Sequence, residues 1–303
     1  MKQLVVLSGK GGTGKTTVTA ALAHLASREV SVVLADADVD AANLELLLSP
    51  TRKEQHAFVA GQVAVIDEDL CEACGTCEAV CRFDAVRPPG SPEEPAFRID
   101  ASACEGCAAC HYQCPSEAIR LEPRECGQWF RSETRFGPLL HAHLYAGQEN
   151  SGKLVTLVRQ QARDLARRTG RDLVLIDGPP GIGCPVISAM SGADAALLVA
   201  EPTVSGVHDL QRALATARHF RVPALLVINK ADLNPRLVDT LEEICDVQGV
   251  EIVGRIPYDI IVTEAMVHGQ PLTVYTNGAM GKILRHVWKN TRNRLLEAEV
   301  IPA

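Results

Sequence analysis

Aromatic side chains are scarce in this chain, and positive charge is in deficit. Only 4% of the 303 residues are Phe, Trp or Tyr, while 47% are hydrophobic; Ala, Val and Leu must therefore fill a substantial core, as they do between helices and sheets. The 30 Lys and Arg are outnumbered by 37 Asp and Glu, for a net charge of −7. This deficit argues against a broad nucleic-acid-binding surface. No apolar run approaches the roughly 20 residues that span a bilayer.

The beginning of the chain also carries no secretory signal, yet cysteine is plentiful, with 11 residues. We therefore expect a cytoplasmic protein, in which the reducing environment disfavours a disulfide framework. Ligation of metals or clusters is then the favoured use of the cysteines.

The strongest motif is the sequence Gly-Lys-Gly-Gly-Thr-Gly-Lys-Thr-Thr at residues 9–17, between an apolar strand expected over 4–7 and an apolar helix expected over 18–26. Glycines allow consecutive backbone N–H groups to curl around phosphate oxygens at the positive end of a helix. Lys15 would neutralise the β- and γ-phosphates, and the Thr16 hydroxyl would bind Mg²⁺. The motif predicts a nucleotide site made by Gly11, Gly12, Thr13, Gly14, Lys15, Thr16 and Thr17.

Other apolar runs also end in polar residues. Residues 31–34 lead into an acidic segment with Asp38, residues 173–176 end at Asp177, and residues 225–228 end at Asn229. The alternation of such runs with helical patterns predicts an α/β fold, a parallel sheet with helices on both faces. Nucleotide would bind at the carboxyl ends of its strands.

A second lysine, Lys10, makes the loop resemble the deviant Walker A motif of the MinD/ParA ATPases. The resemblance implies a P-loop NTPase fold in which Lys10 reaches the phosphates bound by a second subunit, so that ATP binding builds a homodimer. It also implies that Lys10, Lys15 and Asp38 are catalytic, with Asp38 positioning the attacking water. The alternative for Asp38 is a solvated acidic residue in a loop.

The same resemblance implies that Thr16, Asp38 and Asp177 hold Mg²⁺. Asn229 matches the residue that reads adenine, and Pro257 and Asp259 match a loop that closes over the base. An amide or acid after a strand is also ordinary turn chemistry, so that alternative stays open for these positions.

Two cysteine runs, 33 residues apart, interrupt this pattern: Cys71, Cys74, Cys77 and Cys81, then Cys104, Cys107, Cys110 and Cys114. Flanking residues repeat at the same offset, with Asp67 matching Asp100 and Ala85 matching Ala118. An internal repeat predicts two copies of one supersecondary unit. Paired Cys-x-x-Cys spacings also suit zinc, but eight cysteines in a double run favour iron–sulfur clusters.

The runs resemble a bacterial two-cluster ferredoxin, an α+β domain in which the fourth cysteine of each run binds the other cluster. The resemblance implies one [4Fe–4S] cluster on Cys71, Cys74, Cys77 and Cys114, and a second on Cys81, Cys104, Cys107 and Cys110. Arg82 departs from the pattern, which has proline there. We expect a first ATPase segment over residues 1–58, the inserted ferredoxin domain over 59–123, and a second ATPase segment over 124–303.

Three further features are harder to interpret. Cys184 lies in a region where the nitrogenase iron protein carries a cluster cysteine, so Cys184 and Cys126 form a hypothetical third, bridging site, although isolated cysteines are common in cores. Residues 282–296 resemble the basic amphipathic membrane-targeting helix of MinD, yet we expect this helix to pack on the sheet. The segment 126–153 shows no clear periodicity.

As a whole, the chain resembles MinD-superfamily ATPases that contain an inserted ferredoxin domain. This implies a Mg²⁺-dependent dimer that hydrolyses ATP to ADP and phosphate and couples nucleotide state to electron transfer through two clusters, towards a redox partner protein. The alternatives are a MinD-like spatial regulator of cell division with redox-sensing clusters, and an iron–sulfur cluster carrier like the Mrp group.

Overall fold

The computed structural model describes residues 1–91, 95–148 and 150–297, and the chain divides into two compact units. The sheet unit comprises Met1–His56, Gln128–Leu144 and Ser151–Ala303, and the cysteine unit comprises Ala57–Gly127 and Tyr145–Asn150. Both unit boundaries near residues 57 and 127 fall inside long strands, β3 (Arg52–Ile66) and β6 (Ile119–Thr134). The sequence did not suggest that residues 145–150 belong with the cysteines.

A nine-stranded sheet with the order β11-β10-β9-β1-β8-β2-β7-β6-β3 organises the sheet unit. Its strands from β11 to β7 pair in parallel. Because β6 and β7 are joined by only two residues, they form an antiparallel hairpin. The bounds of the parallel strands are β1 Lys2–Ser8, β2 Val32–Asp36, β7 Gly137–Leu144, β8 Leu173–Pro180, β9 Ala195–Ala200, β10 Ala224–Asn229 and β11 Glu251–Ile256.

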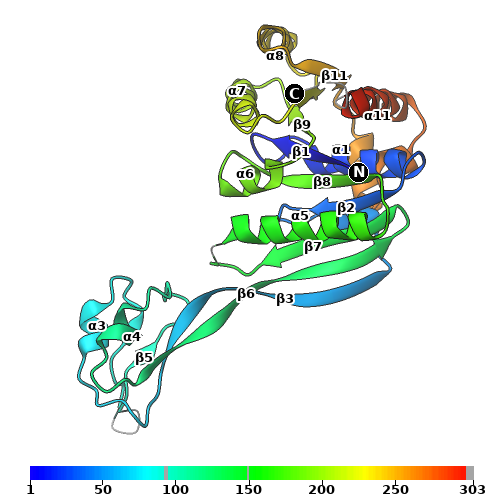
Figure 1. The fold of residues 1–303 in the computed structure, drawn as a ribbon. Coiled ribbons are helices and arrows are strands. Elements are labelled where there is room, and N and C mark those ends of the chain that lie inside the picture. Colours follow the sequence, from blue (N-terminus) through cyan, green and yellow to red (C-terminus); the bar gives the residue numbers. More distant parts are fainter. Residues whose placement is uncertain (92–94, 149, 298–303) are drawn as a thin grey trace. The chain divides into compact units, whose positions relative to one another are not determined.

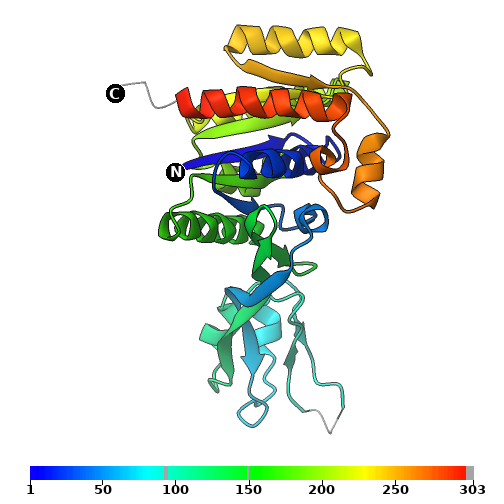
Figure 2. The same ribbon diagram turned by 90° about the vertical axis from the view of Figure 1, so that its right-hand side faces the viewer.

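Helices cover both faces of this sheet, as Figures 1 and 2 show, and its central strands are buried from end to end. One face carries α1 (Lys15–Ser27), α2 (Leu44–Leu48), α9 (Ile261–Val267), α10 (Leu272–Tyr275) and α11 (Ala279–Glu297). The other carries α5 (Ser151–Arg168), α6 (Cys184–Met190), α7 (Val204–His219) and α8 (Pro235–Gln248). Burial on both faces explains why the strands read as continuous apolar runs.

The register of the central strands gathers acidic residues at one edge. Asp177 on β8 lies opposite Val6 of β1 on one side and opposite Asp36 of β2 on the other. Since all three strands are parallel, their carboxyl ends meet where the loop after β1 begins. The fold thereby assembles a polar site from distant parts of the chain.

The cysteine unit is built from two matching halves. It contains α3 (Thr76–Val80), α4 (Ala109–Gln113) and an antiparallel pair, β4 (Val86–Arg87) and β5 (Arg98–Ile99). The backbone N–H of Asp67 donates to Ala118 O, and that of Asp100 donates to Ala85 O, both at 2.7 Å. Positive φ values recur 33 residues apart, in the pairs Ala73 and Gly106, Gly75 and Ala108, and Asp84 and Glu117. The sequence repeat is therefore a structural repeat.

Within residues 126–153, where the sequence shows no clear period, residues 126–134 belong to β6, residues 137–144 form β7, and residues 151–153 begin α5. The burial of β6 does not follow a simple alternation along its length, which is why its strand character is hard to read. Much of this segment therefore belongs to the strands and the helix of the sheet unit.

Helix α11 packs its apolar side into the sheet-unit core. Leu284, Val287, Trp288 and Leu295 are all at most 3% exposed, and the Trp288 indole N–H donates to Glu29 Oε2 at 3.0 Å. The apolar surface that a membrane would need is thus already covered. Within the described ranges, no helix is long and apolar enough to cross a bilayer.

We expect Leu284→Ala to lower the free energy of unfolding of the sheet unit by about 2–5 kcal/mol, because it leaves a cavity under α11. Leu296→Ala, at an exposed position of the same helix, should change it by less than about 0.5 kcal/mol. Tryptophan fluorescence during urea unfolding measures this, since Trp129 and Trp288 both belong to the sheet unit. Equal effects of the two substitutions would contradict the packed position of α11.

Candidate functional site

The loop between β1 and α1 has the backbone conformation that its glycines permit. Gly12 and Gly14 have φ values of 79° and 91°, a region that side-chain-bearing residues rarely adopt. A Cβ atom on Gly14 would overlap the amide nitrogen of Asn229. Gly14 immediately precedes α1, and no side chain caps that helix. The loop therefore leaves the first backbone N–H groups of α1 available to an anion.

Lys15, the first residue of α1, is buried among carboxylates. Its Nζ lies 3.0 Å from Asp177 Oδ1 and 3.5 Å from Asp38 Oδ2. Burial alone would lower the pKa of Lys15, but the nearby carboxylates of Asp177, Asp38 and Asp36 outweigh burial and raise it. The lysine is therefore a permanent positive charge at the phosphate loop.

The next residue, Thr16, donates its hydroxyl to Asp177 Oδ2 at 2.7 Å, and Thr19 Oγ1 lies 2.9 Å from Asp177 Oδ1. Burial raises the pKa of Asp38, against the opposing effect of Lys15. The structure thus brings together Lys15, Thr16, Asp38 and Asp177, which three separate sequence patterns had indicated. Hydroxyl and carboxylate oxygens of this kind suit Mg²⁺.

Asp36 belongs to the same cluster, although sequence reasoning missed it. It is fully buried at the end of β2, where its carboxylate accepts the backbone N–H groups of Asp38 at 3.1 Å and Leu44 at 2.9 Å. Burial and the neighbouring Asp177 raise the pKa of Asp36 to about 8. In the sequence, the position of Asp36 at the end of an apolar run could have indicated that it belongs to the site. Asp36 holds the segment with Asp38 and the start of α2 beside the phosphate loop.

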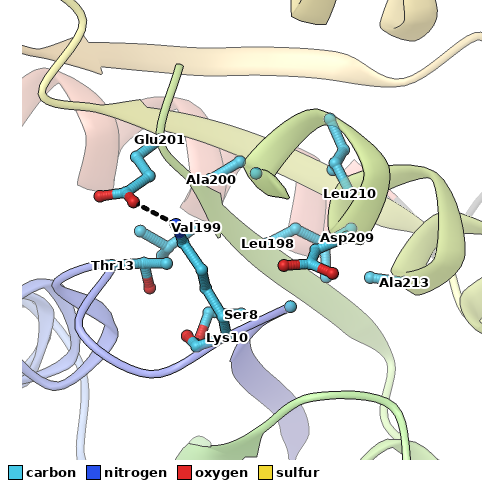
Figure 3. A pocket seen from close by; sticks show the side chains of 12 residues that line it. Ser8, Lys10, Thr13, Leu198, Val199, Ala200, Glu201, Asp209, Leu210 and Ala213 are labelled. Atoms are coloured by element: carbon cyan, nitrogen blue, oxygen red, sulfur yellow. Dashed lines mark hydrogen bonds and ion pairs between the residues drawn. The ribbon is translucent and has the colours of Figure 1, made fainter. Parts of the chain in front are cut away.

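Lys10 is held within its own chain, as Figure 3 shows. Its Nζ lies 2.6 Å from Glu201 Oε1, just beyond β9, and donates to Ser205 Oγ at 2.9 Å. Lys230 binds the other Glu201 oxygen at 2.8 Å. Burial would raise the pKa of Glu201, but the hydrogen bonds from Lys10 and Lys230 outweigh it and lower the pKa. Glu201 is a second residue that sequence reasoning missed, because no motif marks it.

The three residues proposed to contact a base have different surroundings. Asn229 donates its amide to Thr13 O at 2.7 Å and accepts the backbone N–H of Lys230 at 3.0 Å, so it braces the phosphate loop. Asp259 is exposed and accepts the backbone N–H of Ile261 at 3.0 Å, before α9. Pro257 is partly buried after β11. Their contact with a base remains a prediction.

In the cysteine unit, two separate pockets each present four cysteines among apolar side chains. One, lined also by Ile66, Phe97 and Ile119, contains Cys71, Cys74, Cys77 and Cys114. The other, lined also by Ala64, Val86 and Ile99, contains Cys81, Cys104, Cys107 and Cys110. Each pocket combines three cysteines of one run with the last cysteine of the other. Four thiols around one pocket are a donor set for an iron–sulfur cluster or for zinc.

The remaining cysteines differ in exposure. Cys184 is exposed at the first position of α6, whereas Cys126 is only 1% exposed and its thiol donates to Ala60 O at 2.9 Å. A buried thiol does not present itself to a second subunit, so the hypothesis of a bridging site on Cys126 and Cys184 loses support. Cys245 is a core residue, and burial raises its pKa to about 11.

Comparison with known sequences matches residues 4–272 to the family model of the CobQ/CobB/MinD/ParA nucleotide-binding domain. The chain is similar to an uncharacterized protein of Methanocaldococcus jannaschii, with 38% identity over 77% of this chain and 79% of that protein. It is 24% identical to the septum site-determining protein MinD of a Synechocystis species, over 89% and 81% of the two chains. An iron–sulfur cluster carrier protein of Pyrococcus abyssi is 25% identical over 48% and 54%.

Among solved structures, the chain is similar to the cell division ATPase MinD of Pyrococcus furiosus, with a TM-score of 0.60, 21% identity, and coverage of 97% and 99% of the two chains. The septum site-determining protein MinD of Pyrococcus horikoshii in complex with Mg-ADP gives a TM-score of 0.60 at 19% identity, covering 99% of each chain. At such identities the likeness shows the fold alone.

The geometry of the phosphate loop predicts that Gly14→Ala weakens binding of a fluorescent ATP analogue by at least about tenfold. Left-handed backbone strain of about 1–2 kcal/mol and the overlap with Asn229 would both displace the loop. Gly249→Ala is the matched control, because Gly249 also has a positive φ, 67°, but no atom near its would-be Cβ and no place in this loop. Fluorescence anisotropy titration measures the affinity, and equal affinities for the two variants would refute the expected loop geometry.

Proposed function

The chain belongs to the CobQ/CobB/MinD/ParA family of nucleotide-binding domains, and from this premise we propose that it is a Mg²⁺-dependent ATPase whose nucleotide state controls electron transfer through an inserted ferredoxin domain. The fold, with its large parallel sheet, is that of MinD proteins. The proposal has two halves, one for each unit. Different side chains support the two halves.

The ATPase half rests on one observation: Lys15 is buried among Asp36, Asp38 and Asp177. Because burial favours the protonated form of Asp36, Lys15 faces the carboxylates of Asp38 and Asp177. One lysine against these two carboxylates leaves an excess of negative charge, which Mg²⁺ bound to Thr16, Asp38 and Asp177 would offset. Bound Mg²⁺ neutralises charge on the β- and γ-phosphates during phosphoryl transfer. Lys15 would bind the same phosphates, and Asp38, near the loop but less buried than Asp177, would orient the attacking water.

The homodimer in this proposal depends on Lys10. For Lys10 to reach a nucleotide held by another subunit, it must leave Glu201, Thr203 and Ser205, its present partners. Glu201 keeps a second cation, Lys230, when Lys10 departs. The ion pair between Lys10 and Glu201 therefore competes with dimer formation, and ATP would supply the negative charge that replaces Glu201.

Glu201→Gln should consequently increase the dimer fraction at a subsaturating concentration of a non-hydrolysable ATP analogue, because a neutral amide holds Lys10 less strongly. Lys10→Ala should abolish the nucleotide-dependent dimer while leaving nucleotide binding to the monomer largely intact. Sedimentation velocity with and without the analogue measures both. Dimerisation of Lys10→Ala at wild-type analogue concentrations would remove Lys10 from the interface.

The electron-transfer half rests on the crossed cysteine pockets and the 33-residue structural repeat. Each pocket takes its fourth cysteine from the other run, Cys114 in one and Cys81 in the other, as the ferredoxin resemblance implies. [4Fe–4S] clusters supply one-electron transfer at potentials set by their surroundings. The apolar side chains around the thiols would exclude water and so help set those potentials.

Substitution of single cysteines tests the crossed assignment. Cys74→Ser and Cys114→Ser should eliminate the same electron paramagnetic resonance signal, and Cys107→Ser and Cys81→Ser should eliminate the other. Each variant should hold about four irons per chain instead of about eight, while Cys245→Ser, in the core of the sheet unit, should retain all of them. Bound zinc and a silent spectrum in the wild type would instead establish the alternative metal.

The complete proposal is tested by anaerobic redox titration of the clusters with and without Mg-ATP. We expect a shift of several tens of millivolts, where 59 mV in a one-electron couple corresponds to about 1.4 kcal/mol. Reciprocity then requires cluster reduction to change ATP affinity by the same free energy. Lys15→Gln is the control, since the shift should disappear with phosphate binding. Potentials that do not respond to nucleotide would end the coupling proposal.

Two other functions are suggested by relatives: spatial regulation, as the name of Synechocystis MinD indicates, and cluster carriage, as the name of the Pyrococcus abyssi protein indicates. The packed apolar face of α11 gives regulation at a membrane little support. The carrier matches less than half of this chain. We therefore place electron transfer to a protein partner first.

A further inference from the structure

Three potential metal ligands converge between α2 and β7 of the sheet unit, on residues that the nucleotide site does not use. Glu45 on α2, and His141 and His143 on β7, offer ligand atoms that all lie within 4.8 Å of one another. His141 Nδ1 is 3.3 Å from Glu45 Oε2, and His143 Nε2 is 3.4 Å from Glu45 Oε1. No motif in the sequence marks this group, because α2 and β7 are about a hundred positions apart.

His141 gives the group its strongest sign of metal binding. Its side chain is fully buried, and its Nδ1 has no hydrogen-bond partner among the described residues. Its other nitrogen, Nε2, lies 3.0 Å from the buried Ser132 hydroxyl. When Nε2 carries the proton and donates to Ser132, Nδ1 presents a lone pair towards Glu45. Such a hydrogen bond to the distal nitrogen is the usual way in which a ligating histidine is oriented.

His141 Nδ1 lies 3.3 Å from Glu45 Oε2, although no hydrogen bond joins the two atoms. With the proton on Nε2, the Nδ1 lone pair and the carboxylate oxygen would repel each other. A cation between the two groups would remove this repulsion.

We propose that Glu45, His141 and His143 form a binding site for a divalent transition-metal ion of the zinc class. Two imidazoles and one carboxylate are a common ligand set for Zn²⁺ and related ions. Ligands about 2.0–2.1 Å from a tetrahedral ion lie roughly 3.3–3.4 Å apart, close to the two distances between the histidines and Glu45. His143 is partly exposed, which provides an entry path and a place for water as a fourth ligand.

Lys53 is the competing cation at this site. Its Nζ lies 3.5 Å from Glu45 Oε2 and 3.9 Å from the centre of the Phe130 ring. Because its side chain is 43% exposed, Lys53 can turn into solvent when a metal ion binds. Lys53 should therefore weaken metal binding, and its removal should strengthen it.

The site has a structural consequence for the nucleotide cluster. Glu45 follows Leu44, whose backbone N–H binds the carboxylate of Asp36. A metal ion on Glu45 and the two histidines would join the short helix α2 to β7 at a point directly beside that contact. It would thereby restrain the segment that carries Asp38.

Cobalt is the probe for the experiment, because Co²⁺ replaces zinc and its visible spectrum reports its ligands. Titration of the full chain with its iron–sulfur clusters in place, prepared anaerobically so that the two cysteine pockets are occupied, should show one Co²⁺ per chain with a spectrum of nitrogen and oxygen ligands. His143→Gln should weaken this binding more than tenfold, and Lys53→Met should tighten it several-fold. His208→Gln, a change at an exposed histidine on α7, should leave binding unchanged.

The same variants are then heated with and without Zn²⁺, and a rise in unfolding temperature that depends on His143 would support the site. Three results of the Co²⁺ titration would each overturn the proposed metal site. They are a spectrum dominated by thiolate-to-cobalt charge transfer, equal Co²⁺ affinity in wild type and His143→Gln, and binding only at millimolar metal. Circular dichroism of His143→Gln tests whether this variant is folded, which we expect because His143 is partly exposed. The gain expected for Lys53→Met does not depend on any loss of structure.

Discussion

Burial of the Lys15 ammonium among three carboxyl groups is the interaction on which this architecture depends. Its partners are Asp36 at the end of β2, Asp177 within β8 and Asp38 in the segment after β2, so the charge cluster exists only when the parallel strands are in register. The raised pKa of Asp36 shows the cost of this arrangement, because burial beside Asp177 disfavours its ionised form. A divalent cation and phosphates would change that balance, which makes the cluster suited to sensing bound nucleotide.

The two lysines of the phosphate loop differ in how deeply they are buried. Lys15 is fixed deep in the cluster, whereas Lys10 is more exposed and bound to Glu201. In the proposed dimer, the ion pair between Lys10 and Glu201 would be exchanged for a contact with phosphate. Nearby, Asp36 connects the loop to α2, and Glu45 connects α2 towards β7. Through these contacts, bound nucleotide, the segment that carries Asp38 and the proposed metal site would influence one another.

Much of the fold and of the phosphate site could be predicted because their signals are local. A glycine loop between a buried strand and a helix, and acids at strand ends, have few structural alternatives. The 33-residue offset likewise predicted a repeat, which appears in the matched turns and hydrogen bonds of the cysteine unit. The hairpin of β6 and β7 was not predicted, because its mixed burial leaves no simple hydrophobic period.

By itself, the sequence determined the family's loop, the doubly wound pattern and the two cysteine runs, since each depends on neighbouring residues or on a fixed spacing. Only the tertiary structure decided the partners: Asp36 with Asp177, Glu201 with Lys10 and Lys230, and Glu45 with His141 and His143. These pairs join residues from different strands and helices. Their proximity follows from strand order and register, which no local pattern encodes.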